Sequence, residues 1–244
     1  DLNENLSTTI NMDAFEPMVV AAKKAGIKRF VYASSSSVYG VSNKPNVTED
    51  HPLVPLTLYN KYKGLCEPIL LKHTDEKFTG VIFRPATVCG YAPRLRLDLS
   101  VNILTNHAYN KNKITVFGGD QLRPNVHIED MVDSYIAIIN AQANKINGEI
   151  FNVGFKNQTV NELANDVKSV IGNDVNIINT KTNDNRSYHV SSQKIKDVLG
   201  FETKYSVKDA VFDLKVAFEK KLLLDTFNNE FFFNIKRMNN IKLK

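Results

Sequence analysis

The sequence predicts an α/β protein in which helices cover both faces of a parallel sheet. Two observations support this class. Short apolar runs rich in β-branched and aromatic residues recur along the chain, and amphipathic segments of helical period separate them. With 244 residues, 43% of them hydrophobic, the chain has enough apolar material for one large domain or two interleaved ones.

Strands and helices alternate from the first expected helix onward. That helix stops at Gly26, with Pro17 near the start of its ordered part, and Pro68 should end or bend the helix that follows. In chain order, we expect a helix over 12–25, a strand over 29–33, a helix over 58–71, a strand over 79–83, a helix over 99–109, a strand over 114–117, a helix over 129–141, a strand over 148–153, a helix over 160–171, a strand over 175–179, and helices over 191–199 and 207–221.

Charge and composition exclude several functional classes. The 31 basic residues outnumber the 26 acidic ones, but most are scattered lysines, so nucleic-acid binding is not expected. No apolar run approaches the roughly 18 residues of a membrane span, and no signal peptide is visible. Cys66, Cys89 and the five histidines lie in no ligand-spaced cluster, which predicts no metal site and no disulfide framework and favours the cytoplasm.

The most informative pattern combines four serines with a Tyr–Lys pair. The serines follow the strand expected at 29–33, and Tyr59 and Lys63 lie one helical turn apart further along. The spacing alone is weak evidence, because Tyr109 and Lys113 repeat it at a helix end where we expect a surface position. The serines alone could satisfy backbone groups where a strand becomes a loop. Together, strand-end hydroxyls and a phenol beside an ammonium predict a proton-transfer site.

Seven stretches of the chain, in order, resemble the extended short-chain dehydrogenase/reductases, in particular the NAD-dependent nucleotide-sugar epimerases and dehydratases. They are AGIKRFVYASSSSVYG (25–40), EDHPLVP (49–55), YNKYK (59–63), RPATVCG (84–90), VFGG (116–119), RPNVHIED (123–130) and FNVG (151–154). The resemblance implies a partial Rossmann-like doubly wound parallel sheet with a smaller interleaved α/β substrate domain. In this division, residues 1–85 and 125–154 form the cofactor part, 86–124 and 155–220 the substrate part, and 221–244 a tail.

The resemblance also implies roles for individual residues. Tyr59 matches the base that takes a proton from a sugar hydroxyl, and Ser35 the hydroxyl that binds the reacting oxygen. Lys63 matches the residue that holds the nicotinamide ribose, and its charge should lower the pKa of the phenol. The implied cofactor contacts are Ala33, Ser34, Tyr59, Lys63 and Pro85, and the implied substrate contacts are Ser36, Thr87, Arg96, Arg123 and Arg186.

Two departures from the family pattern bear on the reaction. Ser36 and Ser37 stand where the 4,6-dehydratases of the family carry Asp and Glu, the residues that expel water. We therefore expect a 4-epimerase, and the alternatives are a C4 reductase or a 4,6-dehydratase of the same family. Thr87 replaces an Asn that often binds the substrate in the family, so the identity of the sugar stays open.

The residues that would bind the cofactor pyrophosphate are not found in this sequence. None of the 11 glycines forms the strand–turn–helix fingerprint with which the family binds the pyrophosphate, and we expect it in about 80 residues preceding this sequence. NAD is the expected cofactor rather than NADP, although the discriminating residues are absent.

We expect a cytoplasmic homodimer that binds a nucleotide sugar in surface polysaccharide or sugar-nucleotide biosynthesis. A non-catalytic nucleotide-sugar-binding protein is the alternative.

Overall fold

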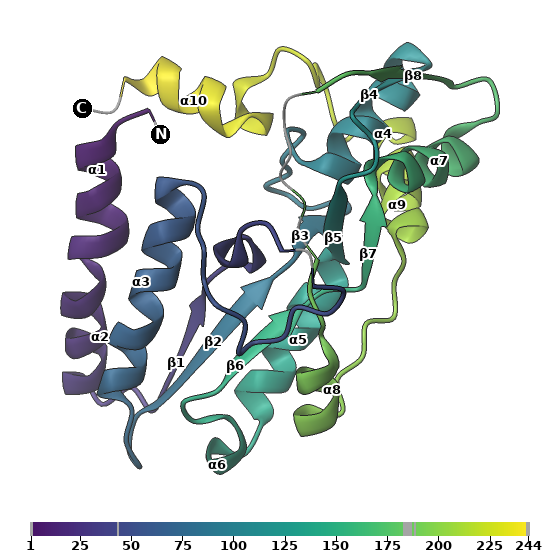
Figure 1. The fold of residues 1–244 in the computed structure, drawn as a ribbon. Coiled ribbons are helices and arrows are strands. Elements are labelled where there is room, and N and C mark those ends of the chain that lie inside the picture. The colour runs from purple at the N-terminus through teal and green to yellow at the C-terminus, as the bar shows by residue number, and fades with distance from the viewer. Residues whose placement is uncertain (1, 43, 183–186, 188, 243–244) are drawn as a thin grey trace.

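The chain folds into two lobes, and the computed structural model describes residues 2–42, 44–182, 187 and 189–242 (Figure 1). The first lobe carries the strands β1, β2 and β6, and the second carries the remaining strands. The elements are α1 (Glu4–Thr8), a π-helical turn (Thr9–Asp13), α2 (Phe15–Lys24), β1 (Arg29–Ala33), a 3-10 turn (Ser36–Tyr39), α3 (Leu58–His73), β2 (Thr79–Pro85), β3 (Thr87–Cys89), α4 (Ser100–Lys111), β4 (Lys113–Phe117), β5 (Leu122–His127), α5 (Ile128–Asn140), α6 (Ala143–Ile146), β6 (Ile150–Val153), β7 (Lys156–Thr159), α7 (Val160–Ile171), β8 (Asn176–Thr180), α8 (Gln193–Leu199), α9 (Val207–Glu219), a 3-10 turn (Glu230–Phe232) and α10 (Asn234–Ile241).

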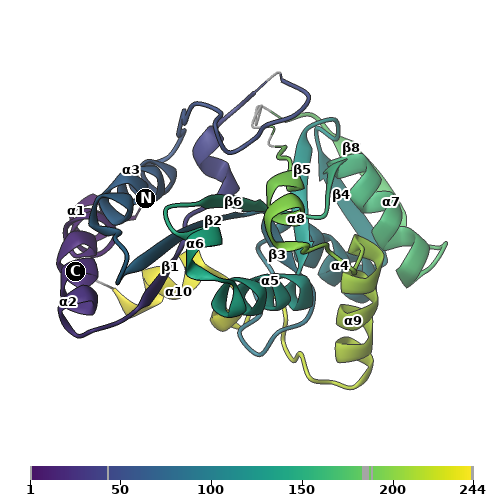
Figure 2. The ribbon, with the colours of Figure 1, turned by 90° about the horizontal axis from the view of Figure 1, so that it is seen from below.

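The first lobe is built on a parallel sheet in the order β1–β2–β6. In its register, Phe83 of β2 lies opposite Ala33 on one side and Phe151 on the other. Alternate side chains of a strand point to opposite faces, so Tyr32 and Ile82 are buried with α2 and α3, whereas Phe83 and Phe151 are buried with α5. Both faces are therefore covered, as Figure 2 shows, and the predicted α/β class is confirmed.

The second lobe contains two smaller sheets and three helices. Strand β5 pairs with β3 in parallel and with β7 in antiparallel orientation, and β4 pairs in parallel with β8. Helices α4, α7 and α9 pack on one another around a core that includes Val101, Val167 and Val211. The chain enters this lobe after β2, returns to the main sheet with β6 and then crosses back, so the lobes are interleaved.

The expectation at Pro17 is confirmed, whereas Pro68 does not end its helix. Helix α3 runs through Pro68 to His73, because Cys66 and Leu70 on either side are fully buried against the sheet. That packing outweighs a local cost of about 3 kcal/mol. Helix α2 begins slightly before Pro17, which lies in its first turn, where a backbone N–H has no intrahelical partner.

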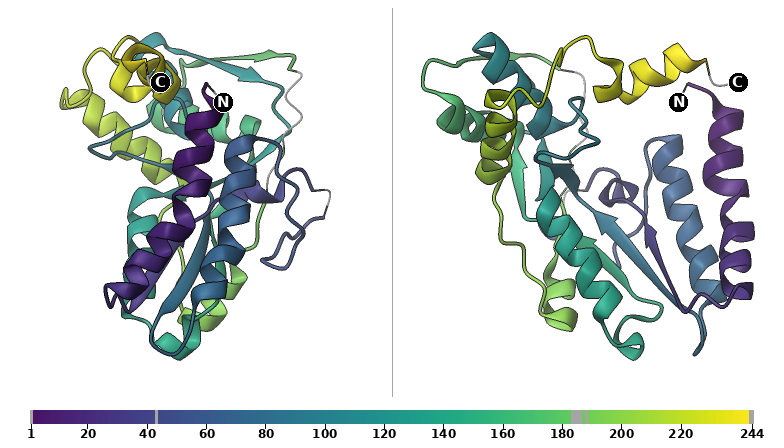
Figure 3. Two further views of the ribbon diagram at one scale, coloured as in Figure 1. Left: turned by 90° about the vertical axis from the view of Figure 1, so that its left-hand side faces the viewer. Right: turned by 180° about the vertical axis from the view of Figure 1, so that it is seen from behind.

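The aromatic tail packs on the body of the chain. The Leu97 amide donates to the Phe232 carbonyl at 2.9 Å, and Phe232 and Phe233 contact a buried cluster that contains Leu214 and Phe218. Helix α10 then extends from the second lobe toward the N-terminus, as the right-hand view of Figure 3 shows. Within the described ranges, none of the helices is both long enough and apolar enough to cross a membrane.

Candidate active site

The strand-end serines lie at the carboxyl edge of the main sheet. Strand β1 ends at Ala33, and the Ser34 amide extends its pairing by donating to the Phe83 carbonyl at 2.7 Å. Ser35 is extended, with φ −160° and ψ 144°, and its hydroxyl accepts from the Ser37 amide at 3.2 Å to cap the 3-10 turn. Ligands of open α/β sheets bind at this edge of the strands.

Helix α3 brings Tyr59 and Lys63 to the same edge. A side-chain cap from Thr57 starts the helix just before Tyr59. Tyr59 lies close enough to Ser35 for that hydroxyl to lower its pKa, and the Lys63 ammonium donates to the Ala33 carbonyl at 2.7 Å. That ammonium lies 5.7 Å from the centre of the Tyr59 ring. The structure thus brings the serine, the phenol and the ammonium together.

Burial is the main influence on the pKa values of Tyr59 and Lys63. Burial raises the pKa of Tyr59, while the charge of Arg96 and the Ser35 hydroxyl act in the opposite direction. The residue as a whole is 46% exposed. Burial also lowers the pKa of the Lys63 ammonium. Without a cofactor, burial therefore outweighs the charge of Arg96, and the predicted lowering of the Tyr59 pKa by Lys63 and the oxidised cofactor stays a prediction.

A cavity of about 610 Å³ opens beside these groups, with walls from both lobes. Ala33 and Lys63 are not part of its lining, and Arg186 lies outside the described residues. The predicted site residues that line it are Ser34, Ser35, Ser36, Tyr59, Pro85, Thr87, Arg96 and Arg123.

Two guanidinium groups face this cavity from the second lobe. Arg96 binds the Asp98 carboxylate through two hydrogen bonds, at 2.9 and 3.2 Å. Arg123 lines the same wall and donates to the Leu122 carbonyl at 2.9 Å. Guanidinium groups are suited to the oxygens of a diphosphate because they can donate two parallel hydrogen bonds.

A buried polar network lies beneath the serines. The Ser34 hydroxyl donates to the Glu67 carboxylate at 2.5 Å, and Arg84 donates to the two oxygens of the same carboxylate at 3.0 and 2.6 Å. Arg84 also donates to the Tyr39 hydroxyl at 2.7 Å. The Ser34 hydroxyl therefore points into the protein, where the Glu67 carboxylate accepts its hydrogen bond. In this structure it is not available for the cofactor contact that we expected from Ser34.

Three polar residues at or under the site were not predicted from the sequence. Asn60 accepts a hydrogen bond from the Ser37 hydroxyl at 2.7 Å, and Asp98 holds Arg96. Glu67 supports the strand end through Ser34. A signal existed for Glu67, which follows Lys63 by one helical turn, and for Asp98, which follows Arg96 by two residues.

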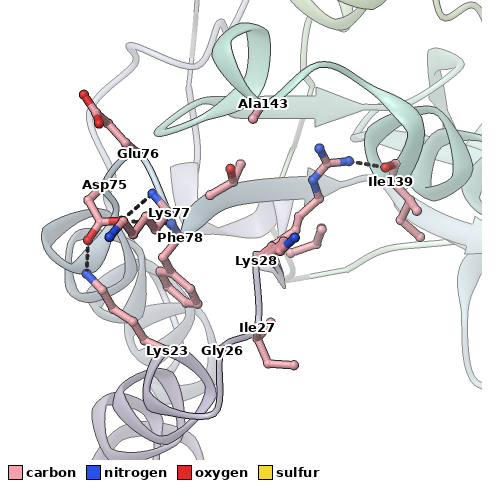
Figure 4. A pocket seen from close by; sticks show the side chains of 13 residues that line it. Lys23, Gly26, Ile27, Lys28, Asp75, Glu76, Lys77, Phe78, Ile139 and Ala143 are labelled. Carbon is pink, nitrogen blue, oxygen red and sulfur yellow. Dashed lines mark hydrogen bonds and ion pairs between the residues drawn. The ribbon is translucent and has the colours of Figure 1, made fainter.

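A larger hollow of about 1090 Å³ lies at the opposite, amino-terminal end of β1 and β2 (Figure 4). Two of its cations are bound within the protein. Lys23 pairs with Asp75 at 2.6 Å, and Arg29 donates to the carbonyls of Ile139 and Ala141 at the end of α5. Because ligands of open α/β sheets bind at the carboxyl ends of the strands, we place the candidate site in the smaller cavity.

A parallel sheet covered on both faces, with hydroxyl, phenol and ammonium groups at its carboxyl edge, defines a Rossmann-type α/β protein. The chain belongs to the NAD dependent epimerase/dehydratase family, whose model matches residues 3–154.

Individual relatives include both epimerases and dehydratases. UDP-glucose 4-epimerase from Lactobacillus helveticus is 28% identical over 224 residues, which cover 82% of this chain and 67% of that enzyme. The crystal structure of UDP-glucose 4-epimerase from Thermotoga maritima with UDP-glucose matches with a TM-score of 0.77 at 24% identity, covering 89% of this chain and 71% of that one. The structure of dTDP-glucose 4,6-dehydratase from Bacillus anthracis in complex with NAD matches with a TM-score of 0.74 at 20% identity, covering 93% and 70%. The chain spans between 45% and 67% of the length of the curated relatives that it matches.

Proposed function

We propose that this protein is an NAD-dependent nucleotide-sugar 4-epimerase. The observation that carries the proposal is that Ser35 and Tyr59 line one cavity together with two arginines, with the Lys63 ammonium 5.7 Å from the centre of the Tyr59 ring. Such an arrangement can remove a proton from a sugar hydroxyl while its carbon loses a hydride. Family membership supports the reaction class, and the choice of 4-epimerase within it is our inference.

The residues present fit the nicotinamide end of NAD. One of the three donors of the Lys63 ammonium is used by the Ala33 carbonyl, which leaves others for the hydroxyls of the nicotinamide ribose. Pro85, at the end of β2, offers an apolar wall of the cavity. Bound NAD would supply the hydride acceptor and a positive charge that favours the Tyr59 phenolate.

In the proposed mechanism, Tyr59 as phenolate takes the proton of the C4 hydroxyl, and Ser35 donates to the reacting oxygen. With the C4 hydride held by bound NAD, the C4 ketone would turn within the cavity so that the hydride returns to its other face, and Tyr59 would return the proton to the C4 oxygen, which gives the opposite configuration. Arg96 and Arg123 would bind the diphosphate, and Ser36 and Thr87 would contact the sugar. Arg96 would exchange at least part of its bond to Asp98 for the phosphate oxygens.

The serines at 36 and 37 favour epimerisation over dehydration. Removal of water across C5 and C6 needs an acid and a base, and neither hydroxyl can supply a carboxylate. A C4 reductase remains the nearest alternative, and a nucleotide-sugar-binding protein without turnover is the alternative outside catalysis. The division into a cofactor part and a substrate part, the homodimer, the cytoplasmic location and the role in surface polysaccharide or sugar-nucleotide biosynthesis stay predictions.

Interconversion of the two C4 epimers of a nucleotide sugar tests the proposal. UDP-, GDP- and dTDP-sugars deuterated at C4 are incubated with NAD and either this chain or the natural protein that contains it, and both C4 epimers are quantified. We expect interconversion with one nucleotide sugar, and Tyr59→Phe should reduce the rate by at least about 100-fold. Tyr109→Phe is the matched control, because the Tyr109 ring stacks on Phe218 and would keep that contact. Binding of a nucleotide sugar by the natural protein with no interconversion of its C4 epimers would refute the enzyme and favour the non-catalytic alternative.

A further inference from the structure

The loop that carries Arg96 has no regular secondary structure of its own. Residues 90–99 join β3 to α4, and within them Leu95 and Leu97 are buried, whereas Arg96 and Asp98 line the candidate cavity. Side chains of this loop therefore alternate between the interior and the cavity. Without a ladder of backbone bonds, the loop depends on packing and on bonds to other parts of the chain to keep one arrangement.

The tail segment 229–234, part of the chain drawn in yellow in Figure 1, supplies much of that support. Its Phe232 carbonyl accepts from the Leu97 amide at 2.9 Å, at the position between the two side chains that face the cavity. Phe232 and Phe233 pack on the buried cluster that contains Leu95 and Leu97. The tail segment therefore fixes the backbone of the loop and completes the apolar cluster on which the loop packs.

Asp98 joins the tail segment to Arg96 directly. Its Oδ1 accepts from Arg96 Nε at 2.9 Å, and its Oδ2 accepts from Arg96 Nη2 and from the Asn234 amide, each at 3.2 Å. Asn234 is the first residue of α10, where an amide has no partner within the helix and is available to the carboxylate. The helix dipole also favours a carboxylate at this end of α10.

The bonds to Asp98 orient the Arg96 guanidinium and leave part of it available to a ligand. They use two of its five N–H donors, so that others can meet the oxygens of a diphosphate. A guanidinium already held at the cavity wall loses less side-chain freedom when a ligand binds. Any contact that fixes Asp98 therefore also fixes the group that would bind the diphosphate.

We propose that the tail segment 229–234 acts on the candidate substrate site, because it holds Arg96 in position for the diphosphate of a nucleotide through Asp98. Asn234 is the positioning residue, since its backbone amide bonds directly to the carboxylate that orients Arg96. The inference rests on the proposed function for the identity of the ligand. The attachment of the loop to the tail segment is a property of this chain.

Two truncations of the natural protein that contains this chain separate the tail segment from the rest of α10. A stop after Asn228 removes the contacts of Phe232, Phe233 and Asn234, whereas a stop after Arg237 keeps them, together with the bond from the Arg237 amide to the Phe233 carbonyl. The probe is whichever of UDP, GDP and dTDP the wild-type protein binds most tightly in calorimetry. We expect its affinity to fall about tenfold with the first stop, the size of one hydrogen bond to an ionised group, and to be unchanged with the second.

Asn234→Pro tests the amide donor by itself. Proline is favoured at the first position of a helix, and Phe233 before it is already extended, with φ −131° and ψ 105°. Asn234→Ala is the matched control, because it keeps the amide and loses only the exposed bond between the Asn234 side chain and Arg94. We expect probe affinity to fall about threefold in the Pro variant and to stay at the wild-type value in the Ala variant. Equal affinities of the two variants would overturn the role of the amide.

Combination with Arg96→Gln decides whether the tail segment acts through Arg96 or only on overall stability. Arg96→Gln alone should lower probe affinity about tenfold, and the stop after Asn228 should then have little further effect. Asn234→Pro should likewise have no further effect in an Asp98→Ala background. A tenfold loss that persists in the Arg96→Gln background, or wild-type affinity after the stop at Asn228, would overturn the inference.

Hydrogen exchange separates this inference from the proposed function. The Leu97 amide should be protected in the wild-type protein and after the stop at Arg237, and should exchange at least about tenfold faster after the stop at Asn228. Equal protection in the two truncated proteins would refute the attachment of the loop. If the wild-type protein binds none of the three nucleotides, the nucleotide-sugar function and the ligand assigned to Arg96 are refuted, whereas Leu97 exchange still decides the attachment.

Discussion

Replacing Glu67 by Gln should destabilise the fold strongly. The Glu67 carboxylate accepts two bonds from Arg84 and one from Ser34, and the side chains of the ion pair are only 3% and 4% exposed. Without the carboxylate charge, the Arg84 guanidinium stays buried without its counter-charge, which costs about 3–5 kcal/mol. In a chain of this size that loss corresponds to a fall in Tm of about 6–20 °C.

Urea denaturation at neutral pH and thermal melting measure this loss. Lys204→Met is the control, because the exposed pair between Lys204 and Asp133 at 2.8 Å should contribute less than about 1 kcal/mol. The double variant Glu67→Leu/Arg84→Met removes both charges of this pair and should be more stable than Glu67→Gln. A loss below about 1 kcal/mol for Glu67→Gln, or a double variant that is less stable still, would refute the reasoning.

Two further predictions concern the cavity and the serine turn. Arg96→Gln removes a charge that lowers the pKa of Tyr59, so the acid limb of the kcat/KM profile should move to higher pH. Arg94→Gln, on the same loop, is the control and should leave that limb in place. Equal shifts in both variants would contradict the assignment of Arg96. Gly40 ends the serine turn at φ 66°, and a Cβ there would lie 2.0 Å from the Val54 carbonyl oxygen. Gly40→Ala should therefore cost about 2–3 kcal/mol or more in urea denaturation, and a variant as stable as the wild type would show that this turn tolerates the strain.

Local pattern was sufficient for most elements of the fold. Helix α7 was expected at 160–171 and is found at Val160–Ile171, because its apolar period and a capping box between Thr159 and Glu162 are both local signals. The short strands β3 and β7 were not predicted. Both pair with β5, a partner distant in sequence, and the residues of β7, Lys156–Thr159, are polar, so nothing local marks them as strands.

Some residues of the candidate site could likewise be predicted from the sequence, and others could not. Tyr59 and Lys63 could be selected because order and context added to a spacing that is nearly uninformative by itself. Asn60 and Glu67 could not, since a polar residue on a helix is indistinguishable from a solvated one until the opposite element is known. Their partners, Ser37 and Ser34, lie 23 and 33 residues away in sequence, and only the fold places them together.

The electrostatics of Tyr59 suggest how proton and hydride transfer are coupled in the proposed reaction. Burial holds the pKa of Tyr59 above its ordinary value, the Lys63 ammonium is bonded to Ala33, and the charge of Arg96 is shared with Asp98. A diphosphate bound to Arg96 would weaken the remaining opposing charge further. Bound oxidised NAD would supply a positive charge that favours the Tyr59 phenolate, and loss of that charge on reduction would favour the protonated phenol. Tyr59 would therefore be the stronger base when a hydride acceptor is present.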